Sequence, residues 1–223
     1  MKSLIPLILF LFASFSAQSE KPNIVIIFTD DQGYADLGCY GSKTNLTPRL
    51  DQLAREGTLF TSFYTQTVCG PSRSALLTGR YPCRSKGWGM PAEEITFAEL
   101  IREAGYQTAC IGKWDVSNRK PIIERMPNAQ GFDYFFGALG ANDAGTVKFH
   151  ENNRAAGSSN DMGGLTTLYT DKSIDFLKNK RDPKKPFALY LAHTMMHTII
   201  DASDRFRGKS KATQNGYTEK QRR

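Results

Sequence analysis

The sequence predicts an α/β fold in which helices flank a mostly parallel sheet. Residues 23–29 form a continuous apolar run rich in β-branched side chains, and residues 187–192 form a second apolar run much later in the chain. Such runs are typical of strands that are buried on both faces, as they are in parallel sheets. Helix signals separate the strand signals, and this alternation indicates an α/β domain.

Caps, glycines and periodicity predict the elements between these two runs. Thr47 and Pro48 begin a helix that ends at Gly57, and residues 96–99 form the capping box of a helix that runs to about residue 105. The other segments follow in chain order: a β-rich segment at 58–64, a short helix at 72–78, a strand at 107–111, an aromatic strand or packed loop at 131–136, long loops at 137–164 and an amphipathic helix at 168–178.

The positive charge is concentrated at the C-terminal end. The chain has 223 residues and a formal net charge of +7, and residues 205–223 contain seven Lys or Arg side chains and one Glu. These 19 residues therefore carry +6, and the rest of the chain is almost neutral. Nucleic-acid binding needs a basic folded face rather than one basic end, so no nucleic-acid partner is expected.

The first 19 residues have the pattern of a signal peptide. Lys2 precedes an apolar run at 4–15, and Ala17 and Ser19 place small residues at a cleavage site. The run is shorter than the roughly 20 residues of a membrane-spanning helix, so stable membrane insertion is not expected, although an uncleaved anchor is an alternative. We therefore expect an exported protein, periplasmic or secreted, with a catalytic region at 20–211 and a hydrophilic tail at 212–223.

Charged and titratable residues follow three of the predicted strands. Asp30 and Asp31 follow the first, Lys113 follows the strand at 107–111, and His193 and His197 follow the last. Ligand sites of open α/β sheets lie at the carboxyl ends of strands, so these side chains are expected at one edge. Two adjacent carboxylates are typical ligands of a hard divalent ion, calcium or magnesium. The alternative is that one of the two aspartates caps a turn or helix and the other is exposed to solvent.

Cys69 precedes the short predicted helix, and Arg73 lies one turn further on. A helix N-terminus favours an anion, which the Arg73 guanidinium can also reach. Cys69 is therefore either a reactive thiol of low pKa, a buried cysteine, or one half of a disulfide, for instance with Cys83.

Residues 68–80 resemble the Cys-x-Pro-Ser-Arg…Thr-Gly-Arg signature of the formylglycine-dependent sulfatases. Four further segments resemble the same family in the same order: the opening strand and metal loop at 22–41, the lysine segment at 108–114, and the segments at 131–137 and 185–193. The resemblance extends from residue 22 to about residue 211. It implies an alkaline-phosphatase-like fold and an arylsulfatase-like sulfuric ester hydrolase that acts on sulfated small molecules or polysaccharides.

The resemblance also implies the roles of individual residues. A maturation enzyme would convert Cys69 into formylglycine, whose hydrated form attacks sulfur with one hydroxyl and expels sulfate with the other. Asp30, Asp31 and the modified Cys69 would bind calcium, with magnesium less favoured. Arg73 and Lys113 would contact the anion and the hydrated aldehyde. His197 would handle the leaving group, with His193 as the alternative.

The sequence departs from the family pattern in two places near these residues. The family reads His-x-x-Pro-His-x-Pro, whereas this chain has no proline in the segment from His193 to Ile199. The family also has Gly-Lys-Trp-His, where this chain has Asp115 in place of the histidine. An aspartate is a weaker base at neutral pH, so Asp115 is either a working substitute or a sign of lost or altered activity.

The resemblance ends before the family's later segments. Nothing after residue 211 matches the Asp-Asn pair and the second lysine that complete the site, so we expect the N-terminal part of a sulfatase domain, apparently truncated at its C-terminal side. A phosphoester or phosphonate hydrolase of the same superfamily is one alternative function. An inactive remnant that binds sulfated glycans is another.

Overall fold

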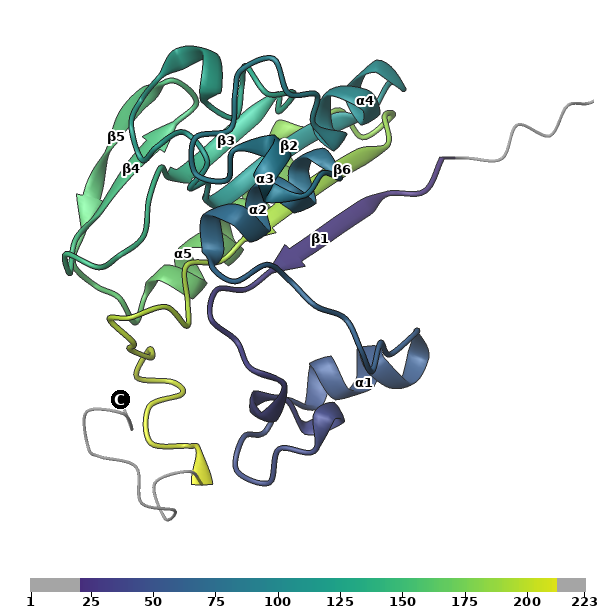
Figure 1. The fold of residues 1–223 in the computed structure, drawn as a ribbon. Helices are drawn as coiled ribbons and strands as arrows, with labels where there is room; N and C mark the ends of the chain where they lie inside the picture. Colours follow the sequence, from purple (N-terminus) through teal and green to yellow (C-terminus); the bar gives the residue numbers. More distant parts are fainter. Residues whose placement is uncertain (1–20, 212–223) are drawn as a thin grey trace, which may run out of the picture.

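A computed structural model of the chain describes residues 21–211, so the predicted signal peptide at 1–19 and tail at 212–223 lie outside the described residues. These residues form one six-stranded sheet in the order β1-β6-β2-β3-β4-β5 (Figure 1). Its strands are β1 (Ile24–Phe28), β2 (Gln107–Lys113), β3 (Tyr134–Ala138), β4 (Val147–Glu151), β5 (Arg154–Ser159) and β6 (Phe187–Ala192).

The first four strands of that order are parallel, and the last two form an antiparallel hairpin. β6 lies between β1 and β2, and β3 follows β2. β4 pairs antiparallel with β3 and with β5. The predicted α/β architecture with a mostly parallel sheet is therefore confirmed. Because the parallel strands point the same way, their carboxyl ends meet at one edge of the sheet.

Helices cover both faces of the sheet (Figure 1). On one face Ile111 and Leu189 pack with Tyr169 of α5, and on the other Cys110 and Tyr190 belong to the same core cluster as Leu77 of α2. The helices are α1 (Pro48–Glu56), α2 (Cys69–Thr78), α3 (Pro82–Ser85), α4 (Phe97–Glu103) and α5 (Leu165–Asp175), which a short π-helix (Phe176–Lys180) continues.

Three predictions about local structure are wrong. The β-rich segment at 58–64 forms no strand, and the segment at 137–164 contains β4 and β5 rather than loops alone. The helix predicted at 72–78 begins earlier, so Cys69 is its first residue instead of the residue before it. The capping box of α4 is present as predicted, with the Thr96 side chain accepting a hydrogen bond from the Glu99 N–H.

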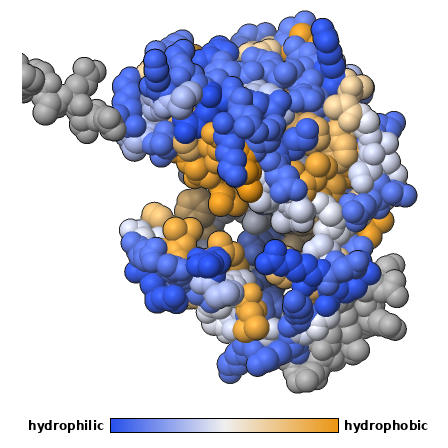
Figure 2. Space-filling view, turned by 180° about the vertical axis from the view of Figure 1, so that it is seen from behind, coloured by the Kyte–Doolittle hydropathy of each residue, from blue (hydrophilic) through white to orange (hydrophobic). Residues whose placement is uncertain are grey.

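β1 forms an open edge of the sheet beside a smaller lobe that contains α1 (Figure 1). Val25 and Ile27 point outward with exposed fractions of 50% and 55%. Figure 2 shows apolar residues around a hollow between this lobe and the rest of the molecule. None of the helices at residues 21–211 is long and apolar enough to span a membrane.

Candidate active site at the carboxyl edge of the sheet

A pocket of about 250 Å³ lies where β1 ends and α2 begins. Asp30, Asp31 and Cys69 all line it, so the structure brings together the two predicted carboxylates and the predicted nucleophile position. Asp30 is 3% exposed and Asp31 has an exposed side chain. Asp31 has a φ of 55°, a left-handed conformation that aspartate adopts more readily than most residues. The turn therefore places the Asp30 carboxylate in the interior and the Asp31 carboxylate at the surface.

The Asp30 carboxylate is engaged by two buried cations. Its Oδ2 lies 2.6 Å from the Lys113 Nζ, and its Oδ1 lies 3.5 Å from a terminal nitrogen of Arg73. Lys113 and Arg73 are both fully buried. A buried carboxylate requires compensation of this kind because desolvation disfavours an unpaired charge. Lys113 and Arg73 therefore sit behind Asp30, and neither lines the pocket.

Arg73 also holds together the ends of two strands. One terminal nitrogen donates a hydrogen bond to the Lys113 carbonyl oxygen at 2.8 Å, and the other donates to the His193 carbonyl oxygen at 3.1 Å. Its Nε is buried with no hydrogen-bond partner among the described residues. The guanidinium thus ties α2 to the ends of β2 and β6, and it keeps one N–H available.

Asp115 is fully buried beside this cluster. Its carboxylate lies 3.5 Å from the Lys113 Nζ, accepts a hydrogen bond from the Arg119 Nε at 2.9 Å, and accepts another from the Trp88 Nε1 at 3.1 Å. Two hydrogen bonds and one further ion pair therefore compensate the burial of the Asp115 carboxylate. The residue that departs from the family pattern is thus part of the site and has a fixed position.

Cys69 stands at the first turn of α2 with a half-buried side chain. Burial, followed by a hydrogen bond and repulsion from the Asp115 carboxylate, raises the pKa of the thiol above its usual range. The alternative of a low-pKa thiol therefore has no support. All four cysteines are free, so the alternative of a disulfide between Cys69 and Cys83 is wrong.

Gly70 explains how Trp88 reaches Asp115. A Cβ at position 70 would lie 2.2 Å from the Trp88 ring, so only glycine lets the indole lie against the backbone of α2. The Trp88 ring thereby bridges the first turn of α2 and the Asp115 carboxylate.

The two candidate histidines occupy different environments. The His197 Nδ1 donates to the Thr198 carbonyl oxygen, and its Nε2 lies 3.9 Å from Asp31 and 3.6 Å from Asp143. His193 is packed against Tyr169 on the inner side, and burial lowers its pKa. The structure therefore places His197, and not His193, beside the exposed carboxylate of the pocket.

The carboxylates of the site are donors of the kind that calcium prefers, but they are too few to bind it alone. Carboxylate oxygens are the ligands that calcium prefers, and six to eight oxygens are needed. Residues 21–211 contain no group of three or more His, Cys, Asp or Glu side chains placed to hold a metal ion. The Asp30 carboxylate is paired with Lys113 instead. The described residues thus do not complete a calcium site.

Sequence reasoning missed three side chains that complete the cluster. Trp88 and Arg119 contact Asp115, and Arg119 also forms a 2.9 Å ion pair with Asp143, which lies beside His197. These residues lie in loops without a motif. The spacing of four residues between Asp115 and Arg119 gave no signal, because side chains four positions apart are neighbours on a helix and these two residues lie in a loop.

Comparison with known proteins identifies the family. The family model described as Sulfatase matches residues 22–223. The mouse N-acetylgalactosamine-6-sulfatase is 34% identical over 86% of this chain and 43% of its own length. Human arylsulfatase A is 44% identical over 62% of this chain and 29% of its own length. The chain thus spans less than half the length of these curated relatives.

Two solved structures with bound sugars have the same fold. One, solved with its substrate D-glucosamine-2-N,6-O-disulfate, is 31% identical with a TM-score of 0.69 over 80% of this chain and 35% of that one. Another, Ps i-CgsB with k-i-k-neocarrahexaose, is 30% identical with a TM-score of 0.76 over 90% of this chain and 50% of that one. The alkaline-phosphatase-like prediction is therefore confirmed, and the chain belongs to the sulfatase family.

Proposed function

We propose that the protein hydrolyses sulfate esters of small molecules or saccharides, with a nucleophile made from Cys69. The observation that carries this proposal is the position of Cys69 at the first turn of α2, in one pocket with Asp30 and Asp31. Family membership supports it, as do the disulfated sugar bound by one similar structure and the oligosaccharide bound by another.

Position 69 suits a formylglycine because a half-buried side chain there opens to the pocket. That group supplies a hydroxyl for attack on sulfur and a second hydroxyl whose deprotonation releases the sulfate. The raised pKa of the Cys69 thiol argues against a mechanism in which the thiol itself attacks. The proposal therefore includes an enzyme that matures Cys69, and export directed by residues 1–19.

Arg73 and Lys113 provide the fixed positive charge of the proposed site. Both are buried within ion-pairing distance of Asp30. Charge that is already held in place stabilises a developing anion without reorganisation at the moment of reaction. Because neither side chain lines the pocket, this charge would act on the anion from behind Asp30.

His197 is the proposed proton donor to the leaving alcohol. The carbonyl oxygen of Thr198 can only accept, so Nδ1 carries a proton and Nε2 is the nitrogen free to exchange one. That Nε2 lies 3.9 Å from the Asp31 carboxylate and 3.6 Å from the Asp143 carboxylate. Asp115, in turn, is the proposed group that positions Lys113 beside position 69.

Asp30 and Asp31 are the proposed ligands of a calcium ion, together with an oxygen at position 69. Because this set is too small for calcium, further oxygen donors would have to complete it. An ion that binds only the native state raises the midpoint of thermal unfolding, so calcium is expected to raise Tm. Magnesium is the weaker candidate.

The test is hydrolysis of an aryl sulfate by protein expressed with a formylglycine-generating enzyme. Cys69→Ala and Cys69→Ser are expected to abolish turnover while Tm stays nearly unchanged, and the matched control Cys83→Ala is expected to retain activity because Cys83 lies outside the pocket. Mass spectrometry of the peptide with Cys69 checks the conversion. Turnover of an aryl phosphate but not of the sulfate would favour the phosphoester alternative, and undiminished turnover by Cys69→Ala would exclude the proposed nucleophile.

A further inference from the structure

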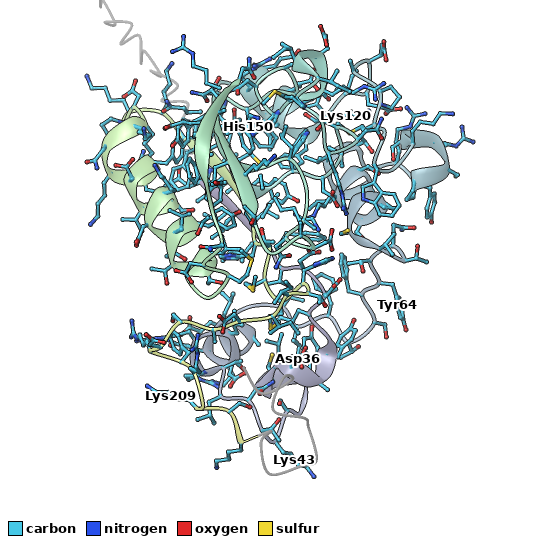
Figure 3. The ribbon with its side chains drawn as sticks, turned by 90° about the vertical axis from the view of Figure 1, so that its left-hand side faces the viewer. Asp36, Lys43, Tyr64, Lys120, His150 and Lys209 are labelled. Atoms are coloured by element: carbon cyan, nitrogen blue, oxygen red, sulfur yellow. The ribbon has the colours of Figure 1, made fainter. Side chains whose placement is uncertain are left out.

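A second, larger cavity lies beside the candidate site. Its volume is about 740 Å³, within the range of cavities that hold small ligands. Its walls come from the strand ends and loops of β3, β4 and β5, and Figure 3 shows His150 on this hairpin, far from the lobe that contains Asp36. The hairpin predicted as loops therefore builds a cavity wall.

This cavity shares two residues with the candidate site. Arg119 and Asp143 line it, and they form a 2.9 Å ion pair. On the site's side, Arg119 contacts Asp115, and Asp143 lies 3.6 Å from the His197 Nε2. The nitrogen proposed to protonate the leaving alcohol thus lies against the wall of the cavity. An alcohol that receives its proton from this nitrogen would leave on the side of the cavity.

The lining of the cavity has the chemistry of a site for an anionic sugar. Lys148 is exposed and forms no ion pair with any described residue, so its charge is available to a ligand. The His150 Nδ1 is buried without a hydrogen-bond partner among the described residues, which fits a ligand hydroxyl. The remaining wall is formed mainly by small residues that leave room for a ring: Gly140, Ala141, Ala144, Ala155 and Gly157.

We propose that this cavity binds the saccharide part of the substrate, and that Lys148 recognises a second anionic group on that saccharide. The inference rests on the proposed sulfatase function and names its substrate class as sugars with more than one anionic group. Binding energy from such a remote group favours extended anionic substrates over an aryl sulfate that cannot reach Lys148.

The test compares two substrates in the full chain after maturation: D-glucosamine-2-N,6-O-disulfate and p-nitrophenyl sulfate. The measured quantity is the ratio of kcat/KM for the disulfate to that for the aryl sulfate. Lys148→Ala and His150→Gln are each expected to lower this ratio, Lys148→Ala by about tenfold, because a hydrogen bond to a charged group contributes about that factor. The control is Lys120→Ala, an exposed lysine next to Arg119 that does not line the cavity and is expected to leave the ratio unchanged.

A direct binding measurement separates this proposal from the proposed function. If the chain hydrolyses neither substrate, the sulfatase proposal fails, and calorimetric titration with the disulfate and with unsulfated glucosamine still tests the cavity. Tighter binding of the disulfate that weakens about tenfold in Lys148→Ala supports the cavity assignment. A ratio unchanged in both variants, or equal binding by wild type and Lys148→Ala, overturns it.

Discussion

The strands β6 and β1 pair directly, but they differ sharply in burial. Every residue of β6 is buried, because β1 and β2 flank it and helices cover both faces. In β1 exposed and half-buried residues alternate, and its outer edge has no partner strand among the described residues. Two similar apolar sequences therefore form one fully buried strand and one half-exposed strand, and the difference comes from the elements that pack against each.

The candidate site repeats this difference between centre and edge. Lys113, at the end of the central strand β2, and Asp115 are fully buried, whereas Asp31, after the edge strand β1, is 58% exposed. The part of the site built by the central strands is thus held by ion pairs in a water-poor environment. Of the two carboxylates that follow β1, Asp30 belongs to this buried network, and only Asp31 is open to solvent.

The largest expected effect concerns the charges of the two regions. Lys113→Met removes a buried ammonium and leaves Asp30 and Asp115 with fewer partners, so it is expected to lower the free energy of unfolding by about 3–5 kcal/mol. The matched change Asp31→Asn is expected to alter it by less than about 0.5 kcal/mol because Asp31 is exposed. Urea unfolding measures both values. Equal losses would show that the two regions do not differ in this way.

A smaller effect is expected for a pair of apolar side chains in register. Leu191 of β6 is 8% exposed and lies opposite Ile27 of β1, which is 55% exposed. Leu191→Ala is expected to lower the free energy of unfolding by about 2–5 kcal/mol, because it removes buried methyl groups and leaves a cavity. Ile27→Ala is expected to lower it by about 1 kcal/mol or less, and urea unfolding measures both values. If Ile27→Ala costs as much as Leu191→Ala, another part of the molecule covers β1 in solution.

The smallest expected effect concerns thiol chemistry before maturation. Burial and the Asp115 carboxylate raise the pKa of Cys69, which lowers its thiolate fraction at neutral pH, and its side chain is half-buried, whereas Cys83 is exposed to the reagent. Iodoacetamide is therefore expected to modify Cys83 faster than Cys69, with the difference narrowing as pH rises. Because the folded-state pKa is raised, this thiol stabilises the fold fully below the usual cysteine pKa and loses that contribution above it. The Cys83→Ser variant reports the rate for Cys69 without Cys83. A rate for Cys69 that exceeds the rate for Cys83 in the unchanged protein would contradict the assigned burial.

Sequence reasoning succeeded where local signals and burial agree. The strand at 187–192 has the predicted bounds because its apolar run lies in the centre of the sheet. The hairpin of β4 and β5 was missed because residues 154–159 contain no β-branched or aromatic side chain, and cross-strand pairing alone makes them a strand. The segment at 58–64 has strand-forming residues but no strand to pair with.

The candidate site was predictable to the extent that strand ends and motif residues define it. Asp30, Lys113 and Arg73 come together because β1 and β2 end, and α2 begins, at one edge of the sheet. Arg119 and Asp143 come from loops whose positions depend on tertiary contacts, so no spacing in the chain places them near His197.

The backbone of Asp30 pairs with the chain that follows β6. Its N–H donates to the Met195 carbonyl oxygen, and its carbonyl oxygen accepts from the Met196 N–H. Its side chain is held by Lys113 at the same time. Asp30 thus acts as a common anchor for the turn that carries Asp31 and the loop that carries His197. The Asp31 carboxylate and the His197 imidazole, 31 and 197 in the chain, are thus placed 3.9 Å apart by the hydrogen bonds of a residue that lies between them in neither sequence nor chemistry.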